Sequence, residues 1–275
     1  MFQVRLNIPG AQRLGKNHDV FFGVSMKTSL GRNWFVGAAV TSIFALASIA
    51  AVTEQPAPFR VGEILNYRVS WSAFTTAASV QLSIPERRDL FGWQTWHFRA
   101  IAQTQGPVAT LFPVDDQFDS YTDAASLETR QFEMHLNELG KISDQVMRFT
   151  IVGQKTKAPG PTVIVQQGTR DGLGALYSLR MVDWQRTPEQ RALVFDGHEI
   201  FDMRARRDGS PESVTVPAGT FTASRVSVTV FQNEKEVSAI HVAVWLASDA
   251  ARTPVVLEAT LPFGTLHAEL VPAPK

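Results

Sequence analysis

Histidines and carboxylates are the side chains of this sequence with the widest range of chemistry. His97, His135, His241 and His267 each stand in the phase opposite to the nearest apolar residues, which places each on the polar face of a strand. If they converged, they could bind a metal or transfer protons. No H-x-H or H-x₃-H spacing supports a metal, so we interpret them as four separate surface histidines and expect no metal and no cofactor.

The densest acidic run, "VDDQFDSYTD", contains Asp115, Asp116, Asp119 and Asp123. Hard cations take oxygen ligands from such loops, but the run lacks the glycine and the terminal glutamate of a calcium loop. A solvated strand end is the favoured interpretation. Pairing of Asp116 and Asp119 with Arg180 or Arg252 is an alternative.

Catalytic signatures are absent from the sequence. The stretch "GTRDGLG" (168–174) lacks the lysine–serine pair of a P-loop, and capping of a helix by Asp171 explains it without a nucleotide. There is no G-x-S-x-G, no H-E-x-x-H and no cysteine, which excludes a thiol nucleophile, thiolate metal sites and disulfides. A hydrolase therefore ranks below a binding protein.

Asp249 and Arg252 stand three residues apart between two predicted strands. We predict that the carboxylate and the guanidinium lock this turn together. The alternative is that Arg252 grips an anionic head group.

The elements that must position these residues are predicted to be antiparallel strands. Apolar residues alternate with polar ones from Phe59 onward, which is typical of strands with one buried and one solvated face. The apolar sets are Leu65/Tyr67/Val69/Trp71, Val80/Leu82/Ile84, Trp96/Phe98/Ala100, Phe132/Met134/Leu136, Phe201/Met203/Ala205, Val226/Val228/Val230 and Leu266/Ala268/Leu270. About ten to twelve strands are expected.

Turn residues separate these runs. Asp196-Gly197 is the strongest hairpin signal, Asp208-Gly209 also predicts a turn, and Pro217-Ala218-Gly219 predicts a hairpin corner between two valine-rich runs. In "DGLGALYSLRMVDW" (171–184) apolar residues recur at three- and four-residue steps instead, which predicts a helix. The predicted fold is mainly β: a large, strongly curved antiparallel sheet that forms a barrel or half-barrel, with one short helix near 171–183.

Seven stretches carry a resemblance to a known family. They are "FRVGEILNYRVSW", "VDDQFDSYTD", "DGLGALYSLR", "VFDGHEIF", "VTVPAGTFTASRV", "VWLASDAARTPV" and "LPFGTLHAEL". In this order they resemble the bacterial exported proteins grouped as domain of unknown function 3108. The resemblance implies an antiparallel β architecture and an exported location, and it implies no reaction. Gly174 stands where the family often has serine, which weakens the idea of a serine nucleophile at the predicted helix.

The N-terminal region has the layout of an export signal. Lys27 and Arg32 precede the apolar stretch 35–49, and small residues allow cleavage after Ala50. We expect residues 1–25 to be untranslated or disordered, 26–50 to be the signal peptide, 51–58 a linker and 59–275 one β domain in the periplasm. The alternative is a single uncleaved membrane anchor over 35–52.

The slightly negative net charge of residues 51–275 argues against nucleic acid as a partner. Residues 51–275 hold 21 basic and 25 acidic residues, a net charge of −4. A curved sheet with one apolar face favours a non-catalytic module that binds an apolar or lipid-like ligand, with an assembly factor that binds an envelope protein through a sheet edge as the alternative. The predicted ligand-binding residues are Tyr67, Trp71, Phe98, Tyr177, Arg180, Trp245 and Arg252.

Overall fold

Alternating apolar residues build one continuous sheet of 14 strands in the computed structural model, which describes residues 56–273. The strands are β1 (Ile64–Trp71), β2 (Phe74–Leu90), β3 (Trp93–Thr104), β4 (Asp115–Asp123), β5 (Thr129–Glu138), β6 (Lys141–Ile151), β7 (Val163–Val165), β8 (Thr169–Asp171), β9 (Glu189–Phe195), β10 (Ile200–Val216), β11 (Gly219–Gln232), β12 (Lys235–Ala247), β13 (Pro254–Leu261) and β14 (Gly264–Val271). All seven predicted apolar sets lie in these strands and face the same, concave side of the sheet.

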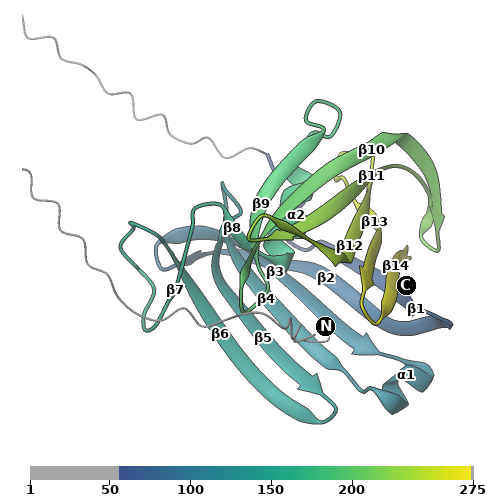
Figure 1. The fold of residues 1–275 in the computed structure, drawn as a ribbon, viewed down its shortest axis with the longest axis horizontal. Helices are drawn as coiled ribbons and strands as arrows, with labels where there is room; N and C mark the ends of the chain where they lie inside the picture. Colours follow the sequence, from purple (N-terminus) through teal and green to yellow (C-terminus); the bar gives the residue numbers. More distant parts are fainter. Residues whose placement is uncertain (1–55, 274–275) are drawn as a thin grey trace, which may run out of the picture. The chain divides into compact units, whose positions relative to one another are not determined.

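The order of the strands brings the two ends of the sheet together. It runs β7-β6-β5-β4-β3-β2-β1-β14-β13-β12-β11-β10-β9-β8, antiparallel except for the parallel end pairs β6–β7 and β8–β9. No ladder joins the ends, but Thr129 Oγ1 on β5 donates to Asp171 Oδ2 of β8 at 2.7 Å, and Phe149 packs on Phe195 at 5.3 Å. The sheet is a nearly closed barrel, which confirms the predicted fold class (Figure 1).

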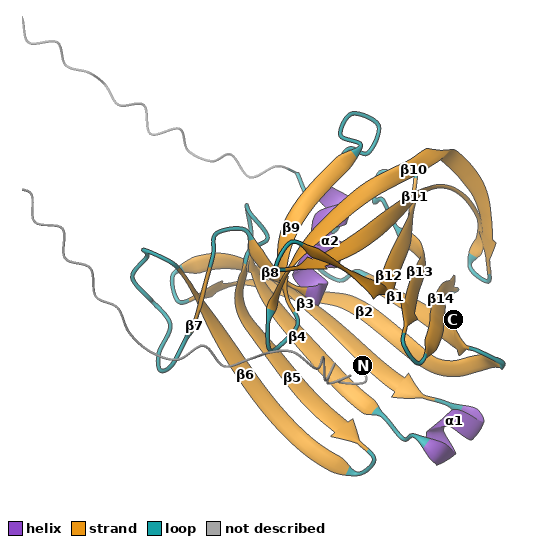
Figure 2. Ribbon diagram, in the orientation of Figure 1, coloured by secondary structure: helices purple, strands orange, loops and turns teal. Residues whose placement is uncertain are grey.

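Two helices accompany the sheet, one more than predicted. α2 (Gly172–Met181) confirms the helix expected near 171–183, and it contacts β3, β4, β8 and β9. The unpredicted α1 (Gly106–Leu111) lies beside the ends of β2 and β3. Figure 2 shows α1 at the end of these strands and α2 inside the curve of the sheet.

The Pro-Ala-Gly corner is the turn of the β10–β11 hairpin, as predicted, with Val216 paired to Gly219. The turn packs on β14 of the same sheet, because Ala218 N donates to Leu270 O at 3.1 Å. The turn predicted at Asp208-Gly209 is wrong. These residues lie inside β10, at a register shift between Asp208 and Glu212 where Gly209 has a φ of +60°.

The predictions for residues 1–50 and for most of the linker fall outside the described residues. In the range 56–273, none of the helices combines the length and the apolar character needed to cross a membrane.

Candidate functional site

The concave face changes from buried to half-buried along the strands. The half-buried apolar residues of this face include one on each of seven strands: Trp71, Val80, Ala102, Val230, Val242, Ala259 and Leu266. On six of these strands the next residue of the face toward α2 is buried at 8% exposure or less: Val69, Leu82, Ala100, Val228, Val244 and Ala268. On β13 the next residue is Leu257, which is half-buried. We call the seven half-buried residues the open apolar face.

Four residues of the open apolar face form a continuous row across the ladders. Val242 pairs with Ala259, Ala259 with Leu266, and Leu266 with Trp71, so four half-buried apolar side chains form one row over β12, β13, β14 and β1. Val80 and Ala102 are paired with each other on β2 and β3, but Val80 lies opposite the buried Tyr67 of β1, so this pair is separate from the row. A row of this kind offers apolar contacts along an extended ligand.

Aromatic side chains border this face at the α1 end. Trp71 has ring contacts with Phe74, Phe112 and Phe263 at centroid distances of 6.2, 6.3 and 6.4 Å. Its indole Nε1 donates to Phe263 O at 3.2 Å. Gly264 permits this approach: its φ is +129°, and an added Cβ would lie 2.8 Å from Trp71 Nε1.

The α2 end of the concave face is filled with side chains. Tyr177 of α2 stacks on Phe98 with ring centroids 3.8 Å apart, and Phe59 packs against both rings. Arg180, 1% exposed, binds Glu63 through two hydrogen bonds of 2.5 and 2.9 Å. Burial raises the pKa of the Tyr177 hydroxyl, which therefore stays neutral at physiological pH.

A buried carboxylate fixes the start of α2, as the sequence predicts. Asp171 caps the helix by accepting from the N–H groups of Leu173 and Gly174 at 2.8 and 3.0 Å. It also accepts from the hydroxyls of Ser120 and Thr129. Burial raises its pKa although all four donors act to lower it. The stretch 168–174 thus attaches the helix to β4 and β5.

The seven predicted ligand-binding residues do not form one group. Tyr67, Phe98, Tyr177 and Arg180 belong to the filled end, where Tyr67 donates to Pro254 O at 2.6 Å. Trp71 lies on the open apolar face. Trp245 lies on the outer face, where it donates to Glu212 at 2.7 Å. As ligand contacts these residues remain predictions.

The predicted ion pair between Asp249 and Arg252 is wrong, and so is the alternative in which Arg180 or Arg252 pairs with the acidic run. Arg252 Nη1 donates to the carbonyls of Arg180 and Met181 at the end of α2, and the Asp249 carboxylate accepts from Thr253 instead. The turn 249–252 is therefore closed by the hydrogen bonds of Thr253 and by Arg252 N, which donates to Asp249 O at 3.2 Å, while the Arg252 side chain holds the helix end. Arg180 pairs with Glu63 rather than with the acidic run of β4.

On the outer face, Asp119 is the centre of a polar cluster on β3 and β4. Its Oδ1 receives His97 Nε2 at 2.5 Å and Arg99 Nε at 2.6 Å, and its Oδ2 accepts from Gln117 at 2.6 Å. Burial of Asp119 acts to raise its pKa, but these hydrogen bonds outweigh it and the pKa is lowered. His97, expected at the surface, is only 4% exposed because it is stacked on Tyr121 at 4.4 Å.

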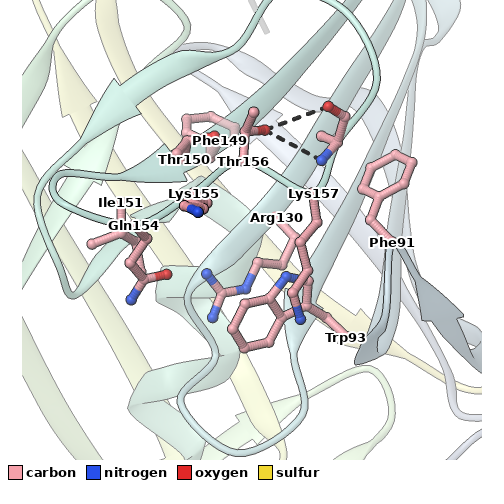
Figure 3. Close-up of a pocket in the computed structure, with 11 residues that line it drawn as sticks. Phe91, Trp93, Arg130, Phe149, Thr150, Ile151, Gln154, Lys155, Thr156 and Lys157 are labelled. Carbon is pink, nitrogen blue, oxygen red and sulfur yellow. Dashed lines mark hydrogen bonds between the residues drawn. The ribbon is translucent and has the colours of Figure 1, made fainter.

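Two pockets among the described residues are small. One, of about 210 Å³, lies between β11, β12 and β13 and is lined by Arg225, His241 and Glu258 among others. Another, of about 20 Å³, is shown in Figure 3. There Arg130 and Lys157 both lie over the Trp93 ring, at 3.9 and 4.4 Å from its centroid. Both pockets are too small for a lipid chain.

Comparison with known proteins identifies relatives by sequence and by fold. Residues 66–271 match the family described as protein of unknown function DUF3108. Among solved structures, a β-barrel-like protein of domain of unknown function DUF1849 from Brucella abortus has a TM-score of 0.49 at 11% identity, over 76% of this chain and 94% of that one.

Two further solved structures match the chain with lower TM-scores. A protein of Parabacteroides distasonis, provisionally described as a lipoprotein, has a TM-score of 0.35 at 12% identity, over 78% of this chain and 96% of that one. A Bacteroides fragilis protein with a YmcC-like fold, provisionally described as exported, has a TM-score of 0.34 at 10% identity, over 80% and 98%. No curated protein matches the chain.

Proposed function

This chain belongs to the DUF3108 family of proteins of unknown function, and we propose that it is a non-catalytic binding module whose open apolar face takes the acyl chain of a fatty acid or lipid. The observation that carries the proposal is the burial gradient of the concave face. Apolar side chains continue past α2 on seven strands and become half-buried there. Covering this surface with a hydrocarbon chain releases about 25 cal/mol per Å² of apolar area.

The shape of the surface supports an extended ligand. The row from Val242 to Trp71 crosses four strands, which at about 4.8 Å per strand spacing spans some 14 Å. That length corresponds to a chain of about eleven methylene groups. The aromatic border around Trp71 supplies amphipathic contacts at the end where a polar head group would leave the protein.

Titration with an undecanoic acid that carries a dansyl fluorophore tests the proposal. We expect saturable binding with enhanced fluorescence by the wild type. Ala259→Trp places an indole in the middle of the row and should weaken binding at least tenfold. Thr260→Trp, the next residue of β13 on the outer face, is the matched control and should change binding less than twofold. Equal binding by both variants, or none by the wild type, would disprove the proposal.

A second candidate is an assembly factor that pairs with an envelope protein through β7. This edge strand, Val163–Val165, contains neither proline nor charge, and Ile164 is 69% exposed. A photo-crosslinking residue at Val163 should trap one defined protein in intact cells, and Ile164→Lys should abolish the adduct. Labelling that is unaffected by this lysine would argue against pairing at this edge.

A further inference from the structure

Three metal-ligating side chains meet on the outer face of β4 and β5. Asp119 is the cross-strand partner of Glu133, and His135 lies two residues further along β5 on the same face. Each offers one ligand atom, and these atoms lie within 4.8 Å of one another. All three stand on paired strands, so their backbone positions are fixed before any ligand arrives.

A second layer of hydrogen bonds orients these groups. His135 Nδ1 is 2.8 Å from Asp144 Oδ1 of β6, which leaves Nε2 directed toward Glu133, 3.6 Å from its Oε2. Gln117 donates to Asp119 at 2.6 Å, and Gln131 donates to Glu133 at 2.5 Å. A carboxylate behind the histidine and amides behind the carboxylates are the usual outer shell of a metal site.

One buried oxygen beside the group has no hydrogen-bond partner. Gln131 is 6% exposed, and its Oε1 accepts no bond from the described part of the chain. Gln131 Nε2 donates to Glu133, so the amide that carries this oxygen is held by one of the three ligating side chains. A buried oxygen without a donor is costly, and a bound cation or a water on it would satisfy it.

The local charge also favours a cation. Asp119, Glu133 and Asp144 contribute three carboxylates, and Arg99 contributes one guanidinium, on Asp119 Oδ1. His97 Nε2 also contacts Asp119 Oδ1. Each carboxylate oxygen has more than one lone pair, so lone pairs remain for a metal.

We propose that His135, Glu133 and Asp119 form a binding site for a divalent first-row transition metal, with Zn²⁺ as the best-fitting ion. One imidazole nitrogen with two carboxylates suits Zn²⁺, Mn²⁺ or Fe²⁺, whereas Mg²⁺ and Ca²⁺ prefer oxygen ligands alone. The sequence rules for metal spacing miss this site because Asp119 and His135 are 16 positions apart and meet only through the β4–β5 register.

A second histidine provides an internal control. His267 of β14 lies between Glu258 and Glu269, with nitrogen–oxygen distances of 3.2 and 3.8 Å, on the outer face of the opposite half of the sheet. It resembles His135 in having two carboxylate neighbours and in its exposure, 36% against 41%. It belongs to no group of three ligands in the described residues.

Calorimetric titration of the full chain with ZnCl₂ tests the site. We expect one Zn²⁺ per chain, at least tenfold weaker binding in His135→Asn and in Glu133→Gln, and no change in His267→Asn. Thermal unfolding without metal checks that the variants fold, and Zn²⁺ should raise the melting temperature of the wild type and of His267→Asn only. Co²⁺ should give a visible absorption band that His135→Asn loses. Absence of binding, unchanged binding in both β5 variants, or equal affinity for Mg²⁺ would overturn the proposal.

Discussion

The two ends of the concave face have the same strands and the same alternation but different coverage. Around α2, Phe98, Tyr177 and Arg180 are 1% exposed or less, whereas toward α1 the residues in the same phase are half-buried. The lengths of the helix and of the strands explain the difference. A ten-residue helix is about 15 Å long, and the 17 residues of β2 extend over about 56 Å. One short helix cannot cover strands of this length, so part of the apolar face stays open.

The filled end should be the more sensitive to loss of charge pairing. Glu63→Gln removes the carboxylate that pairs with Arg180 and leaves a buried, unpaired guanidinium. We expect urea denaturation to show a loss of about 3–5 kcal/mol in unfolding free energy. Arg68→Gln, at the exposed pair with Glu269, should cost less than about 1 kcal/mol. Equal losses at both sites would show that the Arg180–Glu63 pair does not hold the filled end together.

Truncation of apolar side chains should also lower the unfolding free energy by different amounts at the two ends. Phe98→Ala leaves a cavity under Tyr177 and should cost about 3–5 kcal/mol. Leu266→Ala on the open apolar face removes a half-buried side chain and should cost about half as much. If chemical denaturation gave the larger loss for Leu266→Ala, the open end would be packed as tightly as the filled one.

At the filled end, the β4–β5 turn should make a pH-dependent contribution to stability that is smaller than the two effects above. Burial of Asp123 acts to raise its pKa, but the amide N–H of Ser126 and the charge of Arg130 outweigh it, and the pKa is lowered. The unfolded chain then binds more protons, so this stabilisation is present above about pH 4 and is lost as the pH falls through the folded-state value. Asp123→Asn should flatten the acid limb of a melting-temperature profile. An acid limb as steep as that of the wild type would assign the dependence to another group.

The sequence predicts the faces of the strands well because the side-chain period of two is a local property. It does not predict α1, because the six residues Gly106–Leu111 are too few to show a helical period. The helix also buries only Val108 and has no side-chain cap. The parallel strands β7 and β8 have three residues each and no alternation to detect.

Contacts between distant residues limit what the sequence shows of the sites. Arg180 and Glu63 are 117 positions apart, so the sequence leads to the wrong acidic partner. His97 has the phase of a surface residue, and only the β3–β4 register reveals that Asp119 and Tyr121 enclose it. The boundary between the filled and the open apolar residues depends on where α2 packs, which alternation along a single strand does not contain.

Photo-crosslinking with a sixteen-carbon fatty acid that carries a diazirine near its methyl end tests the central claim most directly. The account predicts adducts on the open apolar face, at Val80, Ala102 or Leu266, that an excess of unlabelled fatty acid suppresses. Ile142 and Ile164 are exposed at 76% and 69% and report non-specific labelling. Adducts confined to these two residues, or labelling that unlabelled fatty acid does not reduce, would contradict the claim that the open end of the concave face binds an acyl chain.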